Sequence, residues 1–181
     1  RPWFIPARIR VCRTPVLGRL ALQGMNLFSR AALRMTVCRG RLPAGVADAY
    51  LAPHGAWANR RAVYDFVEDI PLSPTHPTWQ TLGEIEDALP TLAGMPIGLV
   101  WGMRDWCFTP ACLERFRQAW PDAAVRRVDD AGHWVLEDAP EEVAAALREL
   151  VTRTQTATAV GAGGVKGAGD AVAATPGGGA A

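Results

Sequence analysis

The sequence predicts an α/β fold in which a helical block precedes a β-α-β-α segment. Residues 1–93 contain helical patterns separated by prolines and no convincing strand, whereas residues 97–101 and 124–128 are short runs of strand length with a helical pattern between them. Strands that alternate with helices pair in parallel. Two parallel strands do not make a stable sheet alone, so residues 94–153 are expected to be part of a larger sheet.

Composition limits the number of domains. The 181 residues have room for one domain, and a hydrophobic content of 49% is enough for a core. Residues 154–181 are almost entirely Ala, Gly, Thr and Val, which predicts a disordered tail, or a linker to a fused or separate downstream domain. The chain begins with Arg, and we expect it to be a fragment of something longer.

Charge and cysteine content favour a cytoplasmic protein. A net charge of +1 gives no electrostatic footprint for nucleic acid. The arginines of residues 1–41 are spaced among apolar residues, which favours a solvated helix face over a membrane or partner patch. No apolar run approaches the ~18 residues of a membrane helix. The cysteines lack metal-ligand spacing, so we expect reduced thiols, no metal and no cofactor: Cys12, Cys38, Cys107 and Cys112.

Each helix and strand is predicted from its own pattern. Thr14-Pro15 is typical of a cap followed by proline at the first helical position, and Thr109-Pro110 repeats this pattern. Apolar residues at helical intervals define further helices, and Asp138 with Glu141 forms a capping box. In order, the prediction is helices over residues 15–36, 43–51, 57–70 and 78–89, a strand over 97–101, a helix over 109–120, a strand over 124–128 and a helix over 138–151.

Each predicted strand ends in a loop that carries a residue typical of catalysis. Asp105 follows the first strand and His133 the second. Because parallel strands place their carboxyl ends at one edge of the sheet, we expect the two side chains to meet. A carboxylate holds an imidazole in the tautomer that can accept a proton, as in a nucleophile-His-Asp triad. Taken singly, Asp105 could instead cap a helix or pair with Arg104, and His133 could be structural.

Three tryptophans are candidates for lining an apolar substrate pocket. Trp106 and Trp134 are next to the proposed pair, and Trp57 lies in the helical block. Core packing is the alternative for each of them. His54 and His76 are beside prolines and are interpreted as surface turn residues, without a third ligand that would indicate zinc.

Three motifs together resemble a known family. W101-G-M-R-D105, D130-A-G-H133 and E137-D-A-P-E-E142 resemble the carboxy-terminal third of the α/β-hydrolase fold, in the branch of haloalkane dehalogenases and epoxide hydrolases. The stretches I9-R-V-C-R-T-P-V-L-G18, W57-A-N-R60 and F66-V-E-D-I-P-L72 resemble that branch's cap domain. The chain is similar in particular to the β-lactone decarboxylases of long-chain olefin biosynthesis. The resemblance, over residues 1–152, implies a partial α/β-hydrolase fold: a helical cap, then the last two parallel strands with their helices.

The resemblance also implies a nucleophile, aspartate or serine, on a sharp turn after an earlier strand. Ser29 and Ser73 are not in a G-x-S-x-G motif, and no aspartate has the strand-turn-helix context. We therefore expect Asp105 as acid, His133 as base, no nucleophile in this chain, and a small apolar substrate once a missing core completes the site. The substrate is left open among halides, epoxides, esters and β-lactones. The alternative is a non-catalytic truncated product or a helical interaction module.

Overall fold

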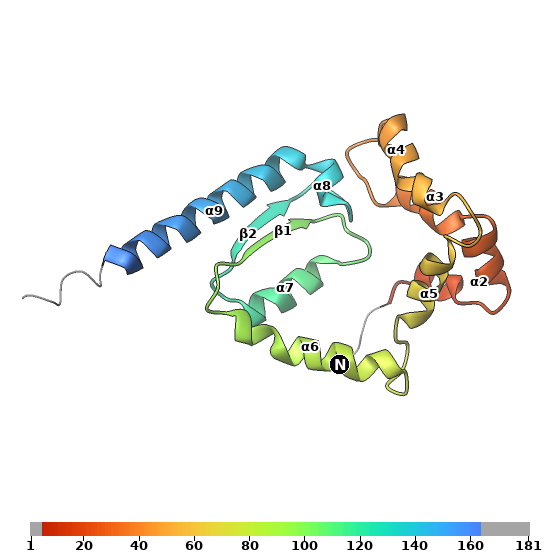
Figure 1. Ribbon diagram of the computed structural model, residues 1–181, viewed down its shortest axis with the longest axis horizontal. Coiled ribbons are helices and arrows are strands. Elements are labelled where there is room, and N and C mark those ends of the chain that lie inside the picture. Colours follow the sequence, from red (N-terminus) through yellow and green to blue (C-terminus); the bar gives the residue numbers. More distant parts are fainter. Residues whose placement is uncertain (1–4, 164–181) are drawn as a thin grey trace, which may run out of the picture.

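The computed structural model describes residues 5–163, with the backbone alone for residues 157–163. A helical region is followed by a β-α-β-α region (Figure 1), which confirms the predicted α/β class. The helical region contains α1 (Ala7–Cys12), α2 (Leu17–Arg19), the π-helical turn η1 (Leu20–Gly24), α3 (Leu27–Met35), α4 (Ala44–Leu51), the 3-10 turn η2 (Ala52–His54), α5 (Arg61–Asp69), α6 (Pro77–Ala88) and the 3-10 turn η3 (Leu89–Leu92). The second region contains β1 (Gly98–Gly102), α7 (Pro110–Ala119), β2 (Ala124–Val128), α8 (Val135–Asp138) and α9 (Pro140–Gly163).

The two strands form a parallel pair. Gly98 is in register with Ala124, and Gly102 with Val128. Helices α7 and α9 lie on opposite sides of the pair (Figure 1). Only the carboxyl end of each strand is buried, at Gly102 and Val128. The other strand residues are at least partly accessible, because within residues 5–163 the strands have no further neighbours.

The continuous helix predicted over residues 15–36 is wrong. The backbone takes a positive φ of 61° at Val16 and of 53° at Asn26, which separates α1, α2 with η1, and α3. Thr14 does not cap a helix, because its hydroxyl donates to the Val11 carbonyl at 2.7 Å. Gly18 allows the chain to fold back there, since a Cβ on it would be 2.1 Å from the Cys12 carbonyl oxygen. The break depends on non-glycine residues with positive φ, which the periodic pattern does not reveal.

Two predicted boundaries near the carboxyl end also move. The capping box is wrong: α8 ends at Asp138 and α9 begins at Pro140, while the Asp138 carboxylate accepts hydrogen bonds from the backbone N–H groups of Cys38, Arg39 and Gly132. Helix α9 continues to Gly163, so the first part of the stretch expected to be a disordered tail, residues 154–163, is helical. The remainder of that predicted tail lies outside the described residues.

Most buried apolar side chains of residues 5–163 gather in two small clusters, and Leu113 on α7 is buried outside them. Ile9, Leu22 and Val67 form one within the helical region. The second cluster, at the carboxyl end of β2, contains Val128, Ala131 and Ala139. Outside these clusters large apolar side chains are exposed, for example Phe66. No helix between residues 5 and 163 is long and apolar enough to cross a membrane.

Candidate active site

The loops that follow β1 and β2 run beside each other. The Met103 N–H donates to the Val128 carbonyl at 2.9 Å, and the Arg104 N–H donates to the Ala131 carbonyl at 2.9 Å. These two bonds extend the strand pairing beyond Gly102 into both loops. As a result the loop with Asp105 and the loop with His133 are held in one fixed register.

Glycines permit this close approach. A Cβ on Gly102 would be 2.2 Å from the Gly132 carbonyl oxygen. A Cβ on Gly132 would be 2.5 Å from the Thr36 carbonyl oxygen and 2.9 Å from the Cys38 sulfur. Real Cβ atoms do not approach backbone atoms this closely, so neither loop position has room for a side chain. The same packing brings the linker after α3 against the histidine loop.

Asp105 and His133 are hydrogen-bonded to each other. His133 Nδ1 lies 2.9 Å from Asp105 Oδ2, and the exposed fractions of the two side chains are 24% for His133 and 7% for Asp105. Asp105 Oδ1 accepts the N–H groups of Cys107 at 2.7 Å and of Phe108 at 2.8 Å. An ionised carboxylate only accepts hydrogen bonds, so Nδ1 donates and Nε2 is left as the proton acceptor of the ring.

An apolar cleft of about 750 Å³ lies in front of this pair. His133, Trp106 and Trp134 contribute to its wall from the strand-end loops. The Trp106 indole N–H donates to the Met35 carbonyl at 2.7 Å, which fixes that ring against α3. The remaining wall comes mainly from α1 to α3: Arg8, Ile9, Val11, Cys12, Thr14, Leu17, Gly18, Ala21, Leu22, Leu27, Phe28, Ala31, Ala32, Met35 and Thr36, with Cys107 from the first loop.

Trp57, the third predicted pocket tryptophan, does not line this cleft. Its side chain is 46% exposed, and its ring centroid lies 5.9 Å from the Arg19 guanidinium carbon. Trp134 instead stacks on Tyr50 with ring centroids 4.6 Å apart. The Tyr50 hydroxyl donates to Glu137 at 2.6 Å, and this bond raises the pKa of Tyr50. Tyr50 therefore supports one wall of the cleft from behind Trp134.

Aromatic rings surround the imidazole. The Phe108 ring centroid is 5.1 Å from that of His133, and the Trp106 centroid is 6.4 Å away. Cys107 lies in the same loop, and burial, with a smaller contribution from the Asp105 charge, raises its pKa to about 11. Its thiol is therefore protonated near neutral pH and is a poor nucleophile. The apolar ring cluster limits the contact of the pair with water.

Other candidate residues lie away from the pair. Ser29 contributes to a separate cavity of about 340 Å³ beside His54, and the Ser73 hydroxyl bonds Thr75 at 2.8 Å. His76 Nδ1 accepts the Thr78 N–H at 3.3 Å, which caps α6. Within residues 5–163, then, neither serine lines the cleft that His133 faces.

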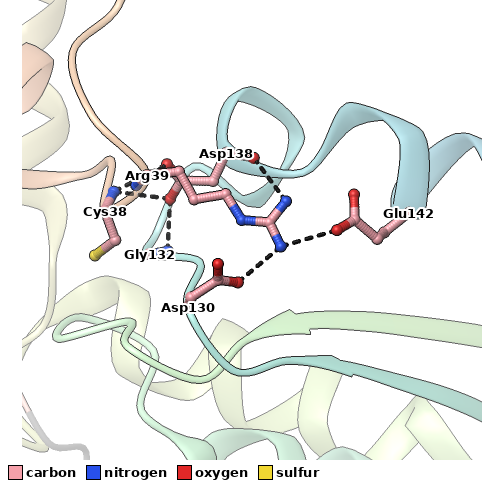
Figure 2. Close-up of polar contacts among 6 residues, drawn as sticks. All are labelled: Cys38, Arg39, Asp130, Gly132, Asp138 and Glu142. Carbon is pink, nitrogen blue, oxygen red and sulfur yellow. Dashed lines mark hydrogen bonds and ion pairs between the residues drawn. The ribbon is translucent and has the colours of Figure 1, made fainter.

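Sequence reasoning missed one cluster next to the site, shown in Figure 2. Asp138, which is 7% exposed, accepts backbone N–H groups from Gly132 in the histidine loop and from Cys38 and Arg39 after α3. The Arg39 side chain donates to Asp130 at 2.7 Å. Because Cys38 and Arg39 are about a hundred positions away from Asp138 in the sequence, no local pattern identifies the cluster, and the local pattern at Asp138 predicts a helix cap instead.

A match to a protein family identifies the fold family of the chain. Residues 32–140 match the family model described as the alpha/beta hydrolase fold. The chain belongs to the α/β-hydrolase fold family. The match begins within α3 and continues past both strand-end loops, so it includes Asp105 and His133.

Sequence relatives show which members of the α/β-hydrolase family this chain is similar to. It is 36% identical over 152 residues to a cis-3-alkyl-4-alkyloxetan-2-one decarboxylase of Shewanella oneidensis, covering 84% of this chain and 48% of the relative. A protein of the same name from Xanthomonas campestris pv. campestris is 41% identical over 149 residues, covering 82% and 49%. Haloalkane dehalogenase 2 of Mycobacterium tuberculosis is 38% identical over 60 residues, covering 33% and 21%. The chain spans about half the length of the two decarboxylases.

Solved structures agree on the fold. Haloalkane dehalogenase DbeA from Bradyrhizobium elkani USDA94 has a TM-score of 0.74 at 24% identity, covering 83% of this chain and 52% of DbeA. DatA from Agrobacterium tumefaciens C58 has a TM-score of 0.70 at 21% identity, covering 81% and 50%. The predicted resemblance to the dehalogenase-like branch and to the β-lactone decarboxylases is thus confirmed, for part of the length of those proteins.

Proposed function

We propose that this chain supplies the acid, Asp105, and the base, His133, of a nucleophile-His-Asp triad. The observation that carries the proposal is the 2.9 Å contact between the two side chains, with His133 on the wall of an apolar cleft. Asp105 holds the ring with Nδ1 as donor, so that Nε2 is free to take a proton from a bound water and to return it later in the turnover. The buried carboxylate then stabilises the imidazolium that forms.

The substrate we propose is an oxetan-2-one, a β-lactone with alkyl groups on two adjacent ring carbons. The relatives named for such a substrate match more than four fifths of this chain, whereas the dehalogenase matches a third of it. Loss of carbon dioxide breaks the bond between the carbonyl carbon and C3 and the bond between C4 and the ring oxygen. C3 and C4 then become a double bond, so the product is an alkene. A largely apolar cleft suits the alkyl chains.

We place the nucleophile, by resemblance an aspartate, in a core outside these 181 residues. Support comes from the half-length coverage of the relatives and from the absence of a serine at the cleft within residues 5–163. Residues 1–93 then form the cap and residues 94–153 the last strands of the core. The free thiols of Cys12, Cys38, Cys107 and Cys112 support a reducing, cytoplasmic location.

The test uses the full-length protein that carries this chain. A cis-3,4-dialkyloxetan-2-one is supplied and alkene is measured for the unaltered protein, for His133→Ala and for the control His76→Ala, which removes a histidine outside the cleft. His133→Ala should lower kcat by at least about 10³-fold, and His76→Ala should leave it within a few-fold. Full alkene release by His133→Ala would refute the role of His133. If a 1-haloalkane releases halide and the lactone releases no alkene, the pair stands and the substrate is the part to correct.

A non-catalytic role is the second candidate, and the exposed apolar side chains favour it. Phe66 is 68% exposed and Leu136 is 61% exposed, which is unusual for a protein that acts alone. Under this reading the chain packs on a partner through these surfaces and needs no substrate. Analytical ultracentrifugation and urea unfolding of the 181-residue chain test whether it needs a partner or a missing core at all. A compact, cooperative monomer contradicts a partner-dependent module and also the need for a missing core.

A further inference from the structure

We propose that Asp138 is a positioning residue that holds the backbone of the His133 loop against the helical region. Arg39 supports this contact through bonds of its side chain to the same loop and to α9. The inference rests on the proposed function only in taking His133 as the base. It concerns a buried carboxylate that touches neither the cleft nor the Asp105 side chain.

Three backbone N–H groups converge on the Asp138 carboxylate (Figure 2). Oδ2 accepts the Gly132 N–H at 2.7 Å, and Oδ1 accepts the Arg39 N–H at 2.8 Å. The Cys38 N–H lies 2.9 Å from both oxygens. One side chain therefore joins the histidine loop to the linker that follows α3. Charge-assisted bonds of this kind are stronger than those between neutral groups.

Both neighbours of His133 depend on this arrangement. The Gly132 N–H donates directly to Asp138, and the Trp134 N–H donates to the Thr36 carbonyl at 3.0 Å. Thr36 lies two residues before Cys38, in the linker that Asp138 also holds. The backbone before His133 is thus held by the carboxylate directly, and the backbone after it is held by a linker that the carboxylate binds at Cys38 and Arg39. The ring has little freedom to move relative to Asp105.

The end of α3 and the start of the linker also form part of the cleft. Met35 and Thr36 line it, and the Met35 carbonyl accepts the Trp106 indole N–H. Asp138 consequently sets the distance between the catalytic ring and the wall of the cleft that faces it. A shift of about 1 Å in such a distance can lower a rate by ~10²-fold. A positioning role is therefore expected to affect kcat, beyond any effect on folding.

Arg39 acts on the outside of this contact. Its guanidinium donates to the Asp138 backbone carbonyl at 3.1 Å and pairs with Asp130 at 2.7 Å and Glu142 at 2.8 Å. Those bonds tie the histidine loop to the first turn of α9 (Figure 2). The guanidinium bonds the backbone carbonyl of Asp138, whereas the carboxylate accepts only backbone N–H groups. Removing the guanidinium should therefore have a smaller effect than altering the Asp138 side chain.

The test compares Asp138→Asn, Arg39→Gln and the control Asp129→Asn in the full-length protein. Asparagine keeps the shape of aspartate but turns an NH2 group toward one of the three donors. We expect hydrogen exchange at the Gly132, Cys38 and Arg39 amides to rise at least ~10-fold in Asp138→Asn. The His133 ring signals in 15N NMR should shift, and kcat should fall by about 10²-fold with KM within about 3-fold. Arg39→Gln should change each quantity in the same direction but less, and Asp129→Asn, an exposed carboxylate in the same loop, should change none.

The outcomes separate the two proposals. Faster amide exchange in Asp138→Asn with unchanged ring signals and unchanged kcat would show a purely structural role and overturn the inference. Should Asp138→Asn fail to fold, Arg39→Gln decides: shifted ring signals support the inference and unshifted ones refute it. If neither the unaltered protein nor any variant releases alkene or halide, the proposed function fails. Amide exchange and the His133 ring signals still test the positioning role in that case.

Discussion

His133 Nδ1 and Asp105 Oδ2 are 2.9 Å apart although 28 positions separate the two residues. Parallel pairing of β1 and β2 produces this contact, because the register that aligns Gly102 with Val128 leaves both side chains just beyond the same sheet edge. The buried acid then lies behind the ring, and the ring faces the cleft. The site of this α/β-hydrolase chain thus follows from strand order together with two close glycine contacts.

Replacing Gly132 with alanine should destabilise the protein. The new Cβ would be 2.5 Å from the Thr36 carbonyl oxygen, which is already fixed by its bond to the Trp134 N–H. We expect a loss of about 1–3 kcal/mol in the free energy of unfolding, as for other overpacked positions. Urea unfolding measures it. Gly94→Ala is the matched control, since no atom lies within 4 Å of its added Cβ; equal effects of the two substitutions would contradict the close contact.

Leu113→Ala should lower stability by about 2–5 kcal/mol, because this side chain on α7 is fully buried and its removal leaves a cavity. The midpoint of urea unfolding reports the change. Gln118→Ala, at an exposed position of the same helix, should stay within about 0.5 kcal/mol. A small effect at Leu113 would mean that α7 does not pack as described.

Cys107 should react slowly with iodoacetamide. Its pKa of about 11 leaves little thiolate at mildly alkaline pH, whereas Cys38 is exposed. Because the Asp105 charge contributes to that raised pKa, Asp105→Asn should lower the pKa of Cys107 and speed its alkylation. Mass spectrometry of the alkylated peptides gives both rates, and Asp122→Asn serves as the control. An unchanged rate in Asp105→Asn would argue against contact between the carboxylate and this loop.

Acid should weaken the contacts of Arg39. Hydrogen bonds from its guanidinium lower the pKa of Asp130 and the pKa of Glu142 below their ordinary values of 3.8 and 4.5. A carboxyl with a lowered pKa stabilises the fold above its unfolded pKa, and that contribution disappears as the pH falls through the folded pKa. Arg39→Gln should therefore destabilise the protein at pH 6 and have a smaller effect near pH 2. Unfolding midpoints across that range measure it, with Arg61→Gln, on the exposed face of α5, as the control. An Arg39→Gln effect that does not shrink in acid would rule out ion pairing as its origin.

Local patterns predicted the β-α-β-α part well because each element carries its own signal. The strand over residues 124–128 has the predicted bounds, and α7 begins at Pro110 after Thr109 as expected, although the Thr109 side chain makes no cap hydrogen bond. The meeting of Asp105 and His133 followed from parallel pairing, which is a rule of topology and needs no side-chain detail. These predictions depend on short-range order or on strand direction alone.

Predictions failed where distant contacts decide the structure. The breaks at Val16 and Asn26 depend on tertiary packing that overrides helix periodicity. At Asp138 the capping pattern competes with three backbone N–H groups, from Cys38, Arg39 and Gly132, and the carboxylate accepts from these instead. The bond from Gly132 is buried, where an unpaired N–H group is costly. Trp57 sits in a motif typical of the cap, and its ring lies beside Arg19 and outside the cleft of the described residues, so its role in substrate binding stays a prediction.

The most direct measurement is 15N NMR of the His133 ring in the full-length protein and in Asp105→Asn, at a pH where the imidazole is neutral. The central claim is that Asp105 holds the ring with its proton on Nδ1 and with Nε2 free to accept. The unaltered protein should show a protonated Nδ1 and an unprotonated Nε2, and Asp105→Asn should lose this preference. A ring protonated on Nε2 in the unaltered protein, or identical ring signals in both proteins, would contradict the claim.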